Sequence, residues 1–348
     1  MVAVVLLGTV AIGCVAAAHL LASASWPRRS PAVAIALWQA IGLGWGVATV
    51  GALARFGASG LGRRPGIGLS GVAAAARATR LLVGAGTAGP RSWDALTAFR
   101  VVSLLAGIVL LGVLCWIQLA AITAVLRARH RQRALLGLLA HDDPKVPGAL
   151  VVDHPAAAAY CVPGLRSAIV ISAGTLDLLD QAELRAVLAH ERAHLRARHD
   201  LVLLPFSALL RAFRWSAVAI EANREVALLV EMMADDRARR RLPAKELATA
   251  LLRVGASGGL APTGALAVAG TTGEGSAATR STGTRSASAP VGALAAAVPA
   301  AALDGQLTAR VTRLLRPPPG LPVAAMVLLG AVAALLVVAP AAAVLLPL

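Results

Sequence analysis

Two histidines, His190 and His194, stand four residues apart in the pentapeptide His-Glu-Arg-Ala-His. On a helix, residues with this spacing share one face about 6 Å apart along the axis, so both imidazole rings could bind one metal ion. Glu191 follows His190 directly, and its carboxylate could take a proton from a water molecule without binding the metal. Two neutral nitrogens, a nearby base and an open coordination position are what a zinc hydrolase requires.

The pentapeptide is more specific than the composition of the chain explains. With seven histidines and seven glutamates in 348 residues, about 0.003 such pentapeptides are expected by chance. The alternative interpretation is an amphipathic helix with a solvated face of histidine and glutamate.

A second acidic pair supports the metal interpretation, since catalytic zinc needs a third protein ligand and two histidines with a glutamate form a standard set. A helix predicted over residues 221–240 carries Glu231 and Asp235 on one face. Glu231 could complete a ligand set for one Zn²⁺ per chain, and Asp235 could accept a hydrogen bond from a ligating histidine. The alternative is a solvated acidic face that pairs with the arginines of residues 237–241.

Three further side chains are candidates for stabilising an oxyanion, namely Tyr160, His199 and Arg224, and the sequence does not choose between them. His199 follows His194 by five residues without an intervening glycine, whereas a third histidine ligand in the extended motif follows by six. We therefore expect His199 to support a ligand or the local structure. The β-prone run 168–172 is expected to present an open edge to which a substrate peptide could add as a strand.

Local signals predict the elements that position these residues. Asp180, with Glu183 three residues later, resembles a capping box that begins the metal-binding helix. The expected buried stripe of this helix consists of Leu184, Val187, Leu188 and Leu195. Short strands are predicted over 151–153, 158–161 and 168–172. Residues 201–220 are apolar but interrupted by Pro205, Arg211 and Arg214, which favours a membrane-hugging helical pair over another span.

The remainder of the chain has the composition of a membrane protein. Apolar residues make up 58% and charged residues 14%, against roughly 25% charged in a typical soluble domain. Four apolar runs are long enough to cross a bilayer, over 2–24, 33–54, 101–126 and 321–346. The fold class expected is a mainly α membrane protein with about four transmembrane helices and an inserted α+β peptidase domain.

Charge gives the expected orientation and excludes one class of partner. The net charge is +16, and four arginines between residues 127 and 133 directly follow the third span, which places the following domain in the cytoplasm. The loop 55–100 carries seven arginines and disagrees with that orientation. No basic stripe is interleaved with aromatic residues, so we expect membrane lipid rather than nucleic acid as the partner of the basic regions.

The predicted organisation has four parts. We expect an N-terminal membrane domain over 1–126, a zinc metallopeptidase domain over 127–255, a flexible low-complexity linker over 256–305, and a short basic helix with the last span over 306–348. The protein is thus expected to be a multi-pass protein of the cell membrane.

The motifs together resemble those of the BlaR/MecR-type membrane metallopeptidases and, more distantly, the HtpX-like and CAAX-prenyl-type membrane peptidases. The resemblance covers about residues 150–240, from Ala-Tyr-Cys-Val-Pro-Gly through His-Glu-Arg-Ala-His to Glu231-x-x-Ala-Asp235. It implies a gluzincin fold with His190, His194 and Glu231 as zinc ligands, Glu191 as the catalytic base and Asp235 in support. Antibiotic-sensing members carry a penicillin-binding domain after the last span; because this sequence ends at Leu348, we expect no such sensor.

The expected function is that of an integral-membrane endopeptidase that cleaves a protein substrate with metal-activated water. Signal transduction through a transcriptional repressor is one role that the resemblance implies. Quality-control proteolysis of membrane proteins is an alternative, and a non-catalytic zinc-binding scaffold is another. An intact Glu191 argues against the scaffold, because a structural zinc site needs no base.

Overall fold

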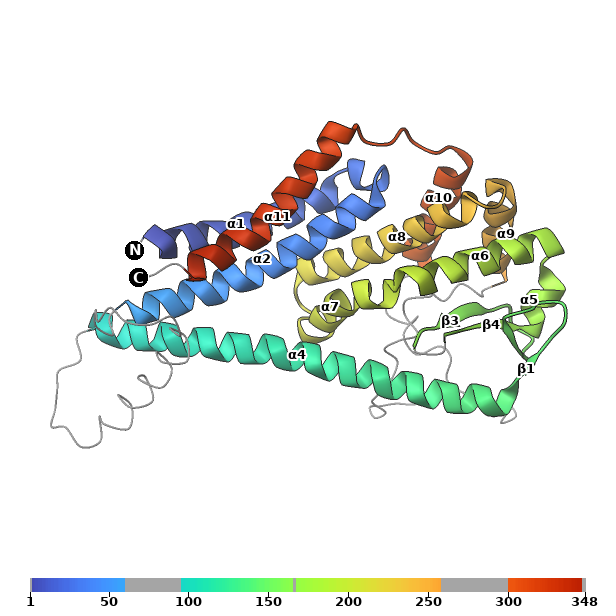
Figure 1. The fold of residues 1–348 in the computed structure, drawn as a ribbon, viewed down its shortest axis with the longest axis horizontal. Helices are drawn as coiled ribbons and strands as arrows, with labels where there is room; N and C mark the ends of the chain where they lie inside the picture. The colour runs from blue at the N-terminus through green and yellow to red at the C-terminus, as the bar shows by residue number, and fades with distance from the viewer. Residues whose placement is uncertain (1, 60–94, 165–166, 258–299, 346–348) are drawn as a thin grey trace. The chain divides into compact units, whose positions relative to one another are not determined.

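The structure is a computed structural model that describes residues 2–59, 95–164, 167–257 and 300–345 (Figure 1). The chain forms two compact units. The first consists of residues 1–117, 214–222 and 320–348, and the second of residues 118–213 and 223–319. The predicted loop 55–100 and linker 256–305 fall mostly outside the described residues.

The first unit is built from long apolar helices. Among the described residues, four helices are long and apolar enough to cross a membrane, namely α1 (Val2–Ser23), α2 (Pro31–Ala58), α4 (Ala95–Leu139) and α11 (Val323–Leu345). Each contains or overlaps one predicted span, so the four apolar runs are helical as expected, and their crossing of a membrane stays a prediction. A short 3-10 helix, η1 (Trp26–Arg28), connects α1 to α2.

Glycines allow α2 and α11 to pack closely. A methyl group at Gly44 would meet the carbonyl oxygen of Leu336 on α11, and one at Gly51 would collide with Val344. In a lipid bilayer the hydrophobic effect does not drive helices together, and small residues promote their association by letting two backbones approach closely. The outward side chains of α11 are apolar as well, with Val327 66% and Leu335 64% exposed, which suits a lipid surface.

The second unit contains a four-stranded sheet in the order β1-β2-β4-β3. Its strands are β1 (Ala140–Asp142), β2 (Leu150–Val152), β3 (Ala159–Val162) and β4 (Ala168–Ser172). β2 pairs with β4 in parallel, and the other two pairings are antiparallel. Three strands are confirmed near their predicted positions, whereas β1 has no counterpart in the sequence prediction.

The prediction that residues 168–172 form an open edge is wrong. β4 lies between β2 and β3, and the two end strands of the sheet in the described part of the chain are β1 and β3. Three consecutive residues of β4, Ile169, Val170 and Ile171, are all buried. A strand that buries both faces needs such a continuous apolar run and belongs in the middle of a sheet, whereas an edge strand does not.

Helices complete the unit. They are α5 (Ala173–Leu178), α6 (Gln181–Ala197), α7 (His199–Ala212), α8 (Ala217–Arg239), α9 (Ala244–Ala256) and α10 (Ala300–Leu315). Of these, α5 and α6 contact the sheet directly through β3 and β4. The main apolar core joins α6 to the sheet and α9 through Leu184, Val187, Leu188, Ile171 and Ala250, with Leu195 partly buried beside it. The predicted buried stripe of α6 is therefore confirmed.

The helix α10 packs into a second apolar core. Leu314 is buried with Leu247 and Leu251 of α9 and with Ala186 of α6, and Val311 packs against them. The sequence predicted a short basic helix over 306–316 that merely precedes the last span. The structure instead makes α10 a packed element of the second unit.

Residues 201–220 are divided between two helices. α7 ends at Ala212 and α8 begins at Ala217, with Pro205 inside α7. The break near residue 213 agrees with a helical pair, whose position at the membrane stays a prediction, and α8 begins four residues before the predicted start at residue 221. Arg129 of α4 lies 2.6 Å from Asp200 and ties α4 to the first turn of α7.

Candidate metal centre

The helix α6 begins where its capping residues predict. The side chain of Asp180 accepts hydrogen bonds from the backbone N–H groups of Ala182 and Glu183, and the Glu183 side chain accepts one from the backbone of Asp180. This capping box satisfies amide groups that the first helical turn leaves without partners. Arg253 of α9 also donates to Glu183 at 2.9 Å, which fixes the helix start against α9.

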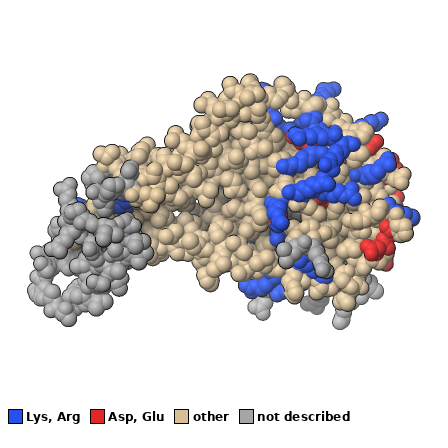
Figure 2. Space-filling model, viewed as in Figure 1, with Lys and Arg blue, Asp and Glu red and all other residues tan. Residues whose placement is uncertain are grey.

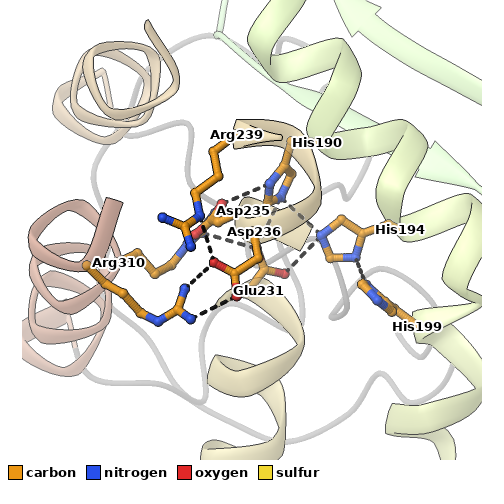
Figure 3. Close-up of polar contacts among 9 residues, drawn as sticks. His190, His194, His199, Glu231, Asp235, Asp236, Arg239 and Arg310 are labelled. Carbon is orange, nitrogen blue, oxygen red and sulfur yellow. Dashed lines mark hydrogen bonds and ion pairs between the residues drawn. The ribbon is translucent and has the colours of Figure 1, made fainter. Parts of the chain in front are cut away.

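The predicted ligands come together on α6 and α8 (Figure 3). His190 and His194 project from one face of α6, with their Nε2 atoms 3.0 Å apart. Glu231 of α8 faces both rings, with Oε2 at 3.4 Å from His190 Nε2 and Oε1 at 3.6 Å from His194 Nε2. All three residues are buried or nearly so.

These distances suit a single tetrahedral ion. Zinc bonds of about 2.0–2.2 Å place tetrahedral ligand atoms about 3.3–3.6 Å from one another. The two Nε2 atoms are 3.0 Å apart, and each has a Glu231 oxygen close to that range, Oε2 at 3.4 Å from His190 and Oε1 at 3.6 Å from His194. Two imidazoles and one carboxylate are also a donor set that zinc favours, so the residues present fit zinc.

Asp235 lies one turn beyond Glu231 on α8 and faces the far side of His190. Its Oδ1 atom is 2.9 Å from His190 Nδ1, which leaves Nε2 of that ring directed at the ligand group. Burial alone would raise the pKa of Asp235, but the charge and hydrogen bonds of Arg310 and the contact with His190 lower it to about 2. Burial would lower the pKa of His190, but Asp235 and Glu231 raise it to about 10.

A left-handed residue brings His199 back to the site. Arg198 has φ +48° and ends α6, so that α7 starts in a new direction. Nδ1 of His199 then lies 3.0 Å from Nδ1 of His194, a contact that a straight helix would not allow for residues five apart. Arg237 lies 2.9 Å from Nε2 of His199, so both ring nitrogens of His199 contact neighbouring side chains.

Glu191 is a buried carboxyl group with one oxygen atom left without a partner among the described residues. Its side chain is 2% exposed, and among the described residues its Oε2 atom has no hydrogen-bond partner. Burial raises the pKa of Glu191, the nearby histidines oppose that shift, and the negative charge of Glu231 adds to it. The Cys161 thiol of β3 donates a hydrogen bond to the same carboxyl group. A carboxylate with a raised pKa suits a group that takes up and returns a proton.

A comparison with protein families now bears on this geometry. Residues 126–249 match the model of peptidase family M48. The matched segment contains all three residues of the ligand group, together with Glu191 and Asp235, and indicates a metallopeptidase domain. No curated protein and no solved structure matches the chain.

The three candidate oxyanion donors lie in different places relative to the ligand group. Tyr160 hydrogen-bonds Gln132 and packs with the cluster around Leu136 on α4. Neighbouring strand residues point to opposite sheet faces, so Tyr160 lies on the face away from Cys161 and outside the ligand group. Both ring nitrogens of His199 are engaged by protein partners. Arg224 is exposed on α8, two turns before Glu231.

One buried side chain of the centre was missed by sequence reasoning. Arg310 of α10 reaches Asp235 and Glu231 (Figure 3), although it lies outside the segment that matches the M48 family. The available signal was the spacing of Arg310 and Arg313 in a helix with an apolar stripe. That signal does not identify which carboxylates the two arginines meet.

Proposed function

We propose that this chain is an integral-membrane zinc endopeptidase that hydrolyses peptide bonds of a protein substrate. The observation that carries the proposal is the buried group of His190, His194 and Glu231 with the buried carboxyl group of Glu191 beside it, whose Oε2 atom has no hydrogen-bond partner among the described residues. The match to peptidase family M48 supports the same reaction class. A buried ligand set that only stabilised the fold would have no use for an ionisable group poised at its side.

The residues divide the chemistry between them. Bound zinc would polarise the scissile carbonyl group and acidify water at the open coordination position. His190, His194 and Glu231 would hold the ion, and Asp235 would keep His190 oriented through its Nδ1 atom. Glu191 would take the proton of the attacking water and deliver it to the leaving amine. Arg224, being exposed on α8, is the remaining candidate among the three predicted oxyanion donors.

The strand β3 is the best support for substrate binding. It ends the sheet in the described part of the chain, and Cys161 on it bonds the Glu191 carboxyl group. An extended substrate that pairs with a sheet edge gains main-chain hydrogen bonds without a specific sequence. A peptide added to β3 would therefore run beside Glu191, which favours an unfolded or extended protein segment as the substrate.

The membrane setting follows from composition and charge. The four long apolar helices support a multi-pass membrane protein. On the face drawn in Figure 2, basic side chains gather in the region where Figure 1 draws α6, α8, α9 and α10. With the arginines after the third predicted span, this charge supports a cytoplasmic metallopeptidase domain and a cytoplasmic or membrane-proximal substrate.

The experiment uses the full chain purified in detergent, with Glu191→Gln as the variant. The expected result is one zinc per chain in both proteins and a loss of peptide hydrolysis of about 10²–10⁴-fold in the variant, the usual contribution of a general base. Normal cleavage by the variant would refute the mechanism, and a wild-type protein without stoichiometric metal would refute the proposed function. Proteomic comparison of cells that carry each form would then separate a single signalling substrate, such as a repressor, from many quality-control substrates.

A further inference from the structure

The buried arginine Arg310 contacts two members of the metal centre at once. Its Nε and Nη2 atoms donate to the two carboxylate oxygens of Asp235, each at 2.8 Å. Its Nη1 atom lies 3.1 Å from Oε2 of Glu231. Arg310 is 8% exposed, so these contacts are shielded from solvent. All five N–H donors of a guanidinium lie in one plane. Here the guanidinium links Glu231, a proposed metal ligand, to Asp235, the carboxylate that contacts the proposed ligand His190.

The charges of the centre explain why such a group is needed. Glu191, Glu231 and Asp235 are three buried carboxyl groups in one small region. Burial of like charges destabilises the ionised forms unless a cation compensates them. Arg310 is a buried cation that contacts two of the three, and it does not contact the ligating nitrogen atoms. It can therefore stabilise the anionic ligand without competing with a metal for the histidines.

The geometry also sets the direction of the Glu231 carboxylate. Contact between Arg310 and Oε2 of Glu231 leaves Oε1 facing Nε2 of His194 at 3.6 Å. The two-pronged contact with Asp235 fixes that side chain where its Oδ1 atom meets Nδ1 of His190. Paired N–H···O bonds from one guanidinium hold a carboxylate in a defined plane, whereas a single bond allows rotation.

A second buried arginine on α10, Arg313, serves as a comparison for the role of Arg310 at the metal centre. Arg313 is also buried, at 9% exposure, and it donates two hydrogen bonds to Asp236 at 2.6 and 2.8 Å. Asp236 lies 3.1 Å from Arg239 and is not part of the ligand group. Both arginines thus attach α10 to α8 by the same chemistry, and the two-pronged bond of Arg313 goes to Asp236, whereas that of Arg310 goes to Asp235 beside the ligand group.

We propose that Arg310 is a positioning residue of the metal centre, which orients Glu231 and Asp235 for binding the metal. This inference rests on the proposed function, because it assigns Arg310 to the same zinc site. It makes α10 a working part of the metallopeptidase domain, although α10 lies some 50 residues beyond the end of the matched M48 segment. The metal centre is then built from three helices, α6, α8 and α10.

The test measures zinc affinity of the full chain in detergent by competition with a chelator. Arg310→Met is expected to weaken zinc binding about 10–100-fold, the usual effect of removing a residue that supports a metal ligand. Arg310→Lys should fall between, because lysine retains the charge and lacks the planar fork. The matched control, Arg313→Met, should retain wild-type zinc affinity. The visible spectrum of Co²⁺ bound in place of zinc should change for Arg310→Met alone, since it reports ligand geometry.

Two results would overturn the inference. The first is wild-type zinc affinity in Arg310→Met. The second is an equal loss of zinc affinity in Arg310→Met and Arg313→Met, which would show that both arginines act only by packing α10 against α8. Thermal unfolding of each variant controls for stability, and Arg310→Lys decides the question if Arg310→Met does not fold. A wild-type protein that binds no zinc would instead refute the proposed function, so the two failures are distinguishable.

Discussion

One face of α6 packs apolar side chains against the sheet and α9, while another holds two histidines against the carboxylates of α8. The apolar face is stabilised by burial that has no preferred direction, at roughly 25 cal/mol per Å² removed from water. The histidine face depends on directed contacts, each of which needs a partner at the correct atom. Stability and the proposed chemistry thus depend on different faces of the same helix, and substitutions should separate them.

The largest effect on stability is expected from the apolar face. Leu188→Ala removes a side chain that is 5% exposed in the main core, and it should lower the free energy of unfolding by about 2–5 kcal/mol through lost burial and a cavity. Leu188→Met, which conserves volume, should lower it by less than about 1.5 kcal/mol. Chemical denaturation of both variants measures the difference. Loss of zinc without loss of stability in Leu188→Ala would contradict the separation of the two faces.

The histidine face should respond in metal affinity. Asp235→Asn retains the shape of the side chain but removes the charge that faces His190 and Arg310, so zinc affinity should fall about 10–100-fold. Asp236→Asn is the matched control, because Asp236 pairs with Arg313 and Arg239, away from the ligand group. Chelator competition at one pH compares the two variants. Equal zinc affinities would show that Asp235 has no supporting role.

The pH dependence of zinc binding follows from His190. In the metal-free protein its pKa is raised to about 10, so below that pH a proton must leave before zinc can bind Nε2. Apparent zinc affinity should therefore fall as the pH decreases, by up to about tenfold per unit while one proton is displaced. Titrations between pH 6 and 9, values chosen to lie below that pKa, measure the slope. A slope of zero would show that His190 is already neutral without metal.

The smallest effect is expected at the turn between α6 and α7. Arg198 adopts φ +48°, a conformation that is unfavourable for a residue with a Cβ atom. Arg198→Gly should raise the free energy of unfolding by about 1 kcal/mol or less, since glycine adopts this conformation without strain. Arg196→Gly, inside α6, should lower it by roughly 0.5–1 kcal/mol. Thermal unfolding distinguishes the signs, and destabilisation by both variants would show that the Arg198 side chain contributes a contact that outweighs its strain.

Predictions from the sequence were most accurate where a signal is local. The spacing of His190 and His194, the Asp180 cap and the four apolar runs each depend on neighbours within a few turns of helix, and the structure contains the corresponding elements. Glu231 needed one further step, because its place beside the histidines depends on how α8 packs on α6. Its identification came from the chemistry of a third ligand rather than from periodicity.

Local sequence signals did not predict three features: the central position of β4, the sheet face of Tyr160 and the contacts of Arg310. Strand order depends on which segments pair across a sheet, and short strands such as β1 carry too few residues for a pattern. The contact between Arg310 and Asp235 joins residues 75 positions apart, across a stretch without periodicity. Many arginines in this chain could have paired with that carboxylate, and the sequence does not rank them.

Residue types and helical periodicity were thus sufficient to predict the helix that carries His190 and His194, the neighbouring Glu191 and the long apolar helices, because these depend on spacing along one helix. The tertiary structure decided which carboxylates, turns and arginines surround that helix, because burial and pairing of charges depend on packing between distant segments. Arg198 and Arg310 are two examples of what the tertiary structure decided. Arg198 turns the chain so that His199 contacts His194, and Arg310 compensates the negative charge of the buried carboxylates of α8.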